Sequence, residues 1–92
     1  MIPLKLPMDP LILNAEEIEI LFRQDPATKE DGGWQRLLVT LQELTDEATG
    51  EITIPPRIIE RIQRYAFDYG NGGWENALMA IFSRNLGSRL GR

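Results

Sequence analysis

The chain has no cysteine and no histidine among its 92 residues. The absence of cysteine excludes disulfide bonds and thiolate metal sites. The absence of histidine removes the commonest metal ligand and the commonest general base near neutral pH. Because both absences argue against most enzymes, we expect a protein that is not an enzyme and that uses no metal or cofactor.

Long apolar runs are also missing. The longest near the N-terminus is Leu-Ile-Leu at residues 11–13, which is far too short to span a membrane. No basic segment precedes an apolar one in the way that a signal peptide requires. We therefore expect a cytoplasmic protein with no membrane partner.

Positive charge is in short supply as well. The chain carries 10 basic and 14 acidic side chains, a net charge of −4. This disfavours general nucleic-acid binding, because phosphates require a positive field. The balance is uneven: residues 1–46 hold four basic and nine acidic side chains, and residues 47–92 hold six basic and five acidic ones. Such a split favours association with an oppositely charged protein surface, including that of a second copy.

What the chain does contain is a tryptophan motif that occurs twice. Asp-Gly-Gly-Trp ends at Trp34, and Asn-Gly-Gly-Trp ends at Trp74, forty residues later. Each copy opens an apolar run with helical spacing. With 42% apolar residues in a chain of this length, the composition indicates one globular domain.

Helical spacing of the apolar residues predicts four helices. Their expected ranges are 15–24, 34–45, 56–69 and 74–86. Two short strands are expected at 11–13 and at 51–54, where polar and β-branched residues alternate. Each strand therefore precedes a pair of helices.

Local signals predict where these helices begin and end. Asn14 is an expected N-cap, and Glu17, three residues later, completes the pattern of a capping box. Asp31 is expected to cap the second helix. A reversal with a left-handed C-cap is expected within residues 70–73, and Gly87 is expected to end the last helix.

The fold class that we predict is mainly α. Four short helices form two β-α-α repeats related by a pseudo-twofold axis, with a small two-stranded β element between them. The strands pair with each other, or each pairs across a dimer. The competing interpretation is a chance resemblance between two generic helix-turn-helix patterns. Within a single domain, 1–92, we expect an extended proline-rich arm at 1–10, repeat one at about 11–46, repeat two at about 51–87 and a loose tail at 88–92.

The clustered carboxylates of the first helix give little sign of chemistry. Glu16, Glu17 and Glu19 crowd one region, and paired carboxylates can perform acid–base work or bind a hard cation. However, Glu16 and Glu19 share a face while Glu17 points elsewhere, and no calcium-loop motif is present. We interpret them as a solvated face with favourable charge at a helix start.

The two tryptophans, Trp34 and Trp74, have two interpretations. In the first they anchor the core at the starts of the second and fourth helices, and the adjacent glycines let the loops pass close to the indoles. In the second they are partly exposed recognition anchors, since tryptophan is enriched at binding hot spots. The sequence leaves both open.

The arginines form the other candidate site. Arg57, Arg61 and Arg64 stand at i, i+4 and i+7, so they share one face of the third helix. The C-terminal end carries three more: Arg84, Arg89 and Arg92. One interpretation is a solvated face with Glu60 nearby, plus positive charge suited to a helix C-terminus. The other is a basic stripe that meets an acidic partner or nucleic acid.

The favoured hypothesis is a small, non-enzymatic protein-interaction module. It acts as an adaptor, regulator or inhibitor through a helical surface, on another protein or on itself as a homodimer. Its partner-binding residues are predicted to be Arg57, Arg61, Arg64, Trp34 and Trp74. The alternative is a nucleic-acid-associated regulator that uses the third-helix stripe and the C-terminal arginines: Arg57, Arg61, Arg64, Arg84, Arg89 and Arg92.

Overall fold

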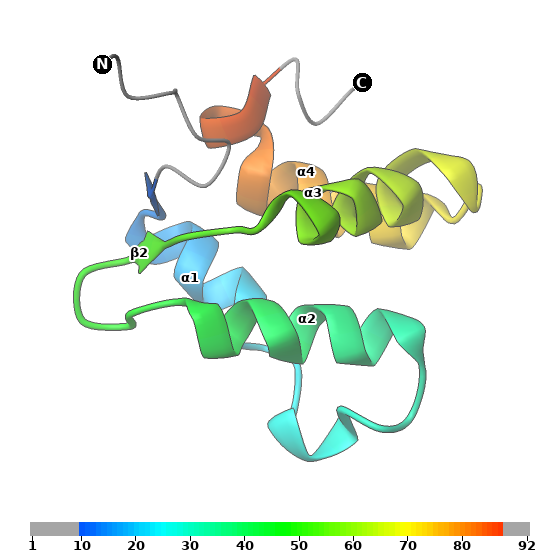
Figure 1. The fold of residues 1–92 in the computed structure, drawn as a ribbon, viewed down its shortest axis with the longest axis horizontal. Helices are drawn as coiled ribbons and strands as arrows, with labels where there is room; N and C mark the ends of the chain where they lie inside the picture. Colours follow the sequence, from blue (N-terminus) through cyan, green and yellow to red (C-terminus); the bar gives the residue numbers. More distant parts are fainter. Residues whose placement is uncertain (1–9, 88–92) are drawn as a thin grey trace, which may run out of the picture.

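The computed structural model describes residues 10–87 and is mainly helical (Figure 1). The elements in chain order are β1 (Leu11–Ile12), α1 (Ala15–Leu21), the 3-10 helix η1 (Pro26–Thr28), α2 (Gly33–Leu44), β2 (Glu51–Ile52), α3 (Pro56–Gln63), the π-helix η2 (Arg64–Asp68) and α4 (Gly72–Leu86). Four α-helices and a two-stranded antiparallel sheet within this range confirm the predicted fold class. The pseudo-twofold relation between the halves stays a prediction, and the predicted tail at 88–92 and all but Pro10 of the predicted arm lie outside the described residues.

The two strands pair with each other inside one chain, which decides between the two pairings expected from the sequence. Leu11 lies opposite Ile52, and Ile12 lies opposite Glu51. The strands are shorter than predicted, because β1 stands between Pro10, which has no amide donor, and Asn14, which caps α1. A ribbon this short is marginal by itself, and it is held by burying Ile52 completely in the core.

Of the two predicted N-caps, Asn14 is confirmed and Asp31 is wrong, while Asn71 caps α4 without having been predicted to do so. Asn14 and Glu17 form the capping box, with the Asn14 side chain accepting from the Glu17 amide at 2.8 Å. Asn71 accepts from the amides of Gly73 and Trp74, so α4 begins earlier than expected. Asp31 was the wrong cap for α2, because the helix begins at residue 33 and its N-cap has no side-chain hydrogen bond.

The other boundary differences have local causes. α1 ends at Leu21, not at 24, because the chain must reach the extended backbone of Asp25 that precedes a proline. The predicted helix 56–69 is continuous from residue 56 to residue 68, but its last turn, Arg64–Asp68, is the π-helix η2. Gly70 and Gly87 have φ of 68° and 49°, as expected for left-handed helix ends.

The core lies where all four α-helices and the ribbon meet. α4 packs against α1 and η2, while α2 packs against α1 and α3. Its largest fully buried side chains are Phe82, Leu21, Leu37, Leu41, Ile52, Ile54, Ile62, Leu78 and Ile81. Figure 1 shows α2 running below α3 and α4, with the ribbon at one end of all three. This arrangement leaves one face of α3 and one face of α2 turned toward the same space.

Candidate binding groove

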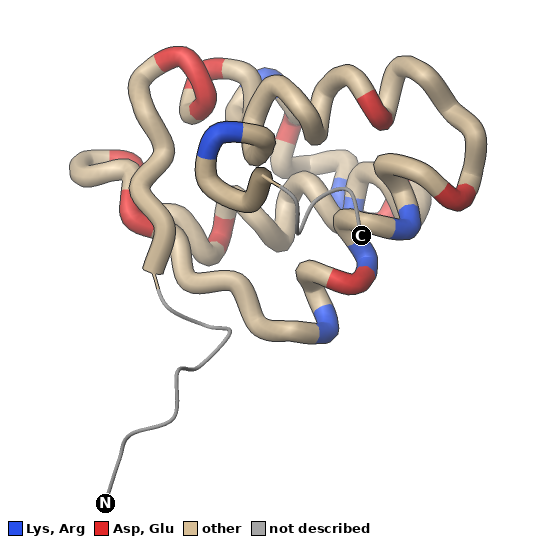
Figure 2. Tube along the Cα trace, turned by 90° about the horizontal axis from the view of Figure 1, so that it is seen from above, with Lys and Arg blue, Asp and Glu red and all other residues tan. Residues whose placement is uncertain are grey.

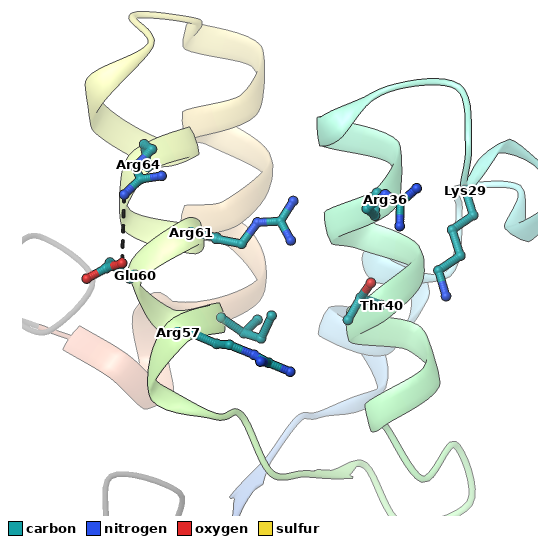
Figure 3. Close-up of a pocket in the computed structure, with 8 residues that line it drawn as sticks. Lys29, Arg36, Thr40, Arg57, Glu60, Arg61 and Arg64 are labelled. Atoms are coloured by element: carbon teal, nitrogen blue, oxygen red, sulfur yellow. Dashed lines mark ion pairs between the residues drawn. The ribbon is translucent and has the colours of Figure 1, made fainter.

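A groove of about 540 Å³ lies between α2 and α3 (Figure 3). Its wall consists of five cations, one carboxylate and two neutral side chains: Lys29, Arg36, Arg57, Arg61, Arg64, Glu60, Thr40 and Ile58. The predicted stripe of α3 supplies three of the cations, because Ile58 and Ile62 are buried and the arginine face of the helix must then point outward. α2 supplies Arg36 and Thr40, which stand four residues apart on one face.

The five cations of the groove differ in their partners. Three have a carboxylate within ion-pair distance: Lys29 with Glu43 (Nζ to Oε1 2.9 Å), Arg36 with Glu30, and Arg64 with Glu60 (Nη2 to Oε1 3.7 Å). Within residues 10–87 no carboxylate lies within that distance of Arg57 or Arg61. Figure 3 shows both side chains extending from α3 toward α2. Two guanidinium groups thus face the groove with their charge uncompensated by the described part of the chain.

This local charge opposes the charge of the whole protein. The chain has a net charge of −4, yet blue positions recur along α3 in Figure 2, while red ones gather at the end that holds the ribbon and the α2–β2 loop. Like charges held close together repel one another, and an anion that enters between them is attracted by all of them. The groove is therefore suited to an anionic ligand.

An aromatic cluster lies beyond one end of the groove, where α2 and α4 begin. Trp34 and Trp74 stack on each other, with ring centroids 5.3 Å apart and planes 14° from parallel. Tyr65 meets Trp74 edge-on at 5.0 Å, and Tyr69 meets Tyr65 edge-on at 4.8 Å. We call these four residues the aromatic cluster. Both tryptophans are partly buried, and Trp34 packs against the hydrophobic core, so core anchoring and use as recognition anchors both stay predictions.

Arg84, which the nucleic-acid alternative includes, pairs with a carboxylate of α1 while its side chain stays half exposed, so its role in that alternative stays a prediction. Its Nε and Nη2 donate to the two carboxylate oxygens of Glu17 at 3.1 and 2.9 Å, and Nη2 also donates to the Ile12 carbonyl at 2.6 Å. The hydrogen bond to Glu17 raises the pKa of Arg84 above its ordinary value. Glu17 is buried, so the expectation that all three glutamates of α1 form a solvated face is also wrong for this one.

Several other polar residues have positions that the sequence did not indicate. Gln42 is buried and donates to the carbonyls of Leu21 and Gln24 at 3.1 and 2.8 Å, so it completes the end of α1 and cannot contact a ligand. Lys29 lines the groove from a loop that carries no periodic signal. Arg36 could have been expected from its spacing to Thr40, but only together with the knowledge that α2 faces α3.

We also searched residues 10–87 for a metal site and for a membrane-spanning helix. No group of three or more acidic side chains there is arranged to hold a metal ion. None of the helices in that range has the length and apolar character needed to cross a membrane. The predicted nucleic-acid residues Arg89 and Arg92 lie outside it. Comparisons with protein-family models, with curated proteins and with solved structures found no match for the chain.

Proposed function

We propose that this protein is a non-enzymatic interaction module that binds an acidic segment of another protein in the groove between α2 and α3. The observation that carries the proposal is the pair of guanidinium groups, Arg57 and Arg61, which line the groove without a carboxylate partner among the described residues. Such groups gain most from a partner's carboxylates, because charge-assisted hydrogen bonds are about twice as strong as neutral ones. An adaptor, regulator or inhibitor role is compatible with this mode of binding.

A carboxylate-bearing protein segment suits the groove better than nucleic acid does. Three of the groove cations already pair with carboxylates, from Glu30, Glu43 and Glu60, and Glu60 itself lines the groove. A long polyanion would also meet the field of the whole molecule, whose net charge is −4. In the nucleic-acid alternative, Arg84 would have to bind phosphate while its guanidinium group pairs with Glu17, which weighs against it.

The test compares matched single-charge variants in affinity capture from a lysate of the source organism, with nuclease added. Arg61→Gln removes a groove cation, and Arg23→Gln removes an exposed arginine whose only described contact is a 3.8 Å pair with Glu19. We expect Arg61→Gln to lower recovery of a specific protein about tenfold, as the loss of one charge-assisted contact does, and Arg23→Gln to leave it unchanged. Adding Arg57→Gln to Arg61→Gln should abolish recovery.

Two results would contradict the proposal. Equal recovery by Arg61→Gln and Arg23→Gln would show that the groove does not bind the partner. Loss of all recovery on nuclease treatment of the wild type would transfer the function to nucleic acid, whose binding should then weaken steeply with salt.

A further inference from the structure

The groove and the aromatic cluster share a helix: Arg61 lines the groove, and Tyr65, four residues later, belongs to the cluster. Gly33, the first residue of α2, has the Tyr65 hydroxyl so close that a Cβ atom on this glycine would overlap it. The absence of a side chain at Gly33 therefore lets the Tyr65 hydroxyl of η2 approach the start of α2. Tyr65 is thus shared: its hydroxyl meets α2, and its ring contacts both tryptophans.

One face of the α3–η2 helix links the two features. Arg57, Arg61, Tyr65 and Tyr69 follow one another at intervals of four residues, and residues four apart on a helix are neighbours on its surface. The π-helix begins at Arg64, just where cations give way to aromatic rings, and such π segments are frequent at functional sites. Tyr69 is the C-cap of η2, eight residues after Arg61, and at the α-helical rise this is at most about 12 Å along the axis, so three or four residues of extended peptide cover the distance.

The aromatic cluster is open to solvent at its outer edge. Tyr69 has 53% of its surface exposed, and both tryptophans are half-buried. Every tryptophan and tyrosine of the chain belongs to this cluster. Exposed aromatic rings beside uncompensated arginines form the composition of a binding hot spot, because these residue types dominate interface energetics.

We propose that the groove and the aromatic cluster form one continuous binding surface, whose ligand is an acidic protein segment that also carries an aromatic side chain. The carboxylates of the segment pair with Arg57 and Arg61, and its aromatic ring packs edge-on or offset against Tyr69 and Trp74. An extended segment satisfies both contacts when its aromatic residue follows the carboxylates by three or four positions. This inference rests on the proposed function and specifies the partner that the groove selects.

Three synthetic peptides of about ten residues test the proposal on the full-length protein. The first carries three glutamates and, four positions after the last, a phenylalanine; the second has alanine in place of phenylalanine; the third has glutamine in place of each glutamate. Tryptophan emission is the readout, since Trp34 and Trp74 are the only tryptophans and phenylalanine does not emit in their range. We expect the first peptide to bind about three- to tenfold more tightly than the second, and the third not to bind.

Variants of Tyr69 assign the gain to the aromatic cluster. Tyr69→Ala should reduce the affinity for the phenylalanine peptide to that for the alanine peptide, whereas Tyr69→Phe should keep the difference. Both variants change an exposed side chain, so the fold is expected to survive, and circular dichroism verifies this.

The outcomes separate this inference from the proposed function. Equal binding of the phenylalanine and alanine peptides, both above the glutamine peptide, overturns the composite surface and leaves the acidic groove. Failure to distinguish glutamate from glutamine overturns both. Tighter binding of a single-stranded oligonucleotide than of the phenylalanine peptide at equal salt also overturns both, because stacked bases and phosphates would then explain the surface.

Discussion

The two ends of this molecule use arginine in opposite ways. At the ribbon end, Arg84 of α4 donates three hydrogen bonds: two to the Glu17 carboxylate of α1 and one to the Ile12 carbonyl of β1. Both partners lie far from Arg84 in the sequence. In the groove, Arg57 and Arg61 have no carboxylate partner within residues 10–87. The difference teaches that the fold, not the residue type, decides whether a charge stabilises the protein or remains available to a ligand.

The contrast extends to the rest of the polar groups. In the described range, no buried side-chain nitrogen or oxygen lacks a hydrogen-bond partner. Gln42 and Glu17, the two buried polar residues, are both fully engaged in closing helix ends. The two guanidinium groups without a carboxylate partner in that range, those of Arg57 and Arg61, lie at the surface, in the groove. The described part of the chain thus satisfies its buried polar groups completely and leaves Arg57 and Arg61, in the groove, without a carboxylate partner.

The largest predicted loss of stability comes from a substitution at the ribbon end. Glu17→Ala removes the capping box and the carboxylate that Arg84 contacts, and we expect the free energy of unfolding to fall by about 2–3 kcal/mol in urea denaturation. Glu16→Ala is the matched control, because Glu16 is the preceding residue on the same helix and is exposed. It should change stability by less than about 0.5 kcal/mol. Equal effects of the two substitutions would show that the Glu17 contacts contribute nothing.

The second prediction compares one glycine from each end. Gly50 has a φ of 81°, and a Cβ there would overlap the Leu13 carbonyl oxygen, a backbone atom that cannot swing aside. Gly70 has a similar φ of 68°, with no atom near its Cβ position. We expect Gly50→Ala to lower the free energy of unfolding by about 2 kcal/mol, and Gly70→Ala by about 1 kcal/mol from backbone strain alone.

Thermal unfolding followed by circular dichroism measures both glycine variants under identical conditions. If Gly70→Ala destabilised the protein as much as Gly50→Ala, positive φ would account for the whole effect. The close approach of Leu13 to Gly50 at the ribbon end would then carry no penalty of its own.

The features that the sequence predicted correctly depend on residues that lie close together in the chain. The capping box of Asn14 and Glu17 spans three residues and was recognised, whereas the partner of Glu17, Arg84, stands 67 residues away and no pairing between them was predicted. The arginine face of α3 followed from helical spacing. The opposite wall, with Arg36 and Lys29, depended on how α2 packs beside α3, and no pattern within either segment encodes that packing.

The tryptophan motifs show the same limit. Their repetition identified Trp34 and Trp74 as special, but not that their rings stack on each other. Gly33 was expected to let a loop pass close to the indole of Trp34, yet it is the first residue of α2 and gives the Tyr65 hydroxyl room. Both corrections come from contacts between helices that the sequence places thirty or more residues apart.

The smallest predicted effect on stability comes from replacing a groove arginine, and it tests most directly whether the groove arginines differ from Arg84. Arg61→Ala should change the free energy of unfolding by less than about 0.5 kcal/mol, and toward higher stability, because it relieves repulsion among the groove cations. Arg23→Ala is the control: it changes the net charge from −4 to −5 in the same way, but outside the groove.

Salt dependence separates the two arginines further, because salt screens the repulsion that Arg61 contributes. Between about 0.01 and 0.1 M salt the screening length falls from about 30 to about 10 Å. The urea midpoint of the wild type should therefore rise with salt more than that of Arg61→Ala, while Arg23→Ala should follow the wild type more closely. Since both variants alter the net charge equally, self-repulsion of the acidic chain cancels from this comparison.

A midpoint for Arg61→Ala well below that for Arg23→Ala at both salt concentrations would mean that the guanidinium group holds the groove wall together. Arg61 would then stabilise the fold, as Arg84 does, and the groove would lose its basis as a binding site.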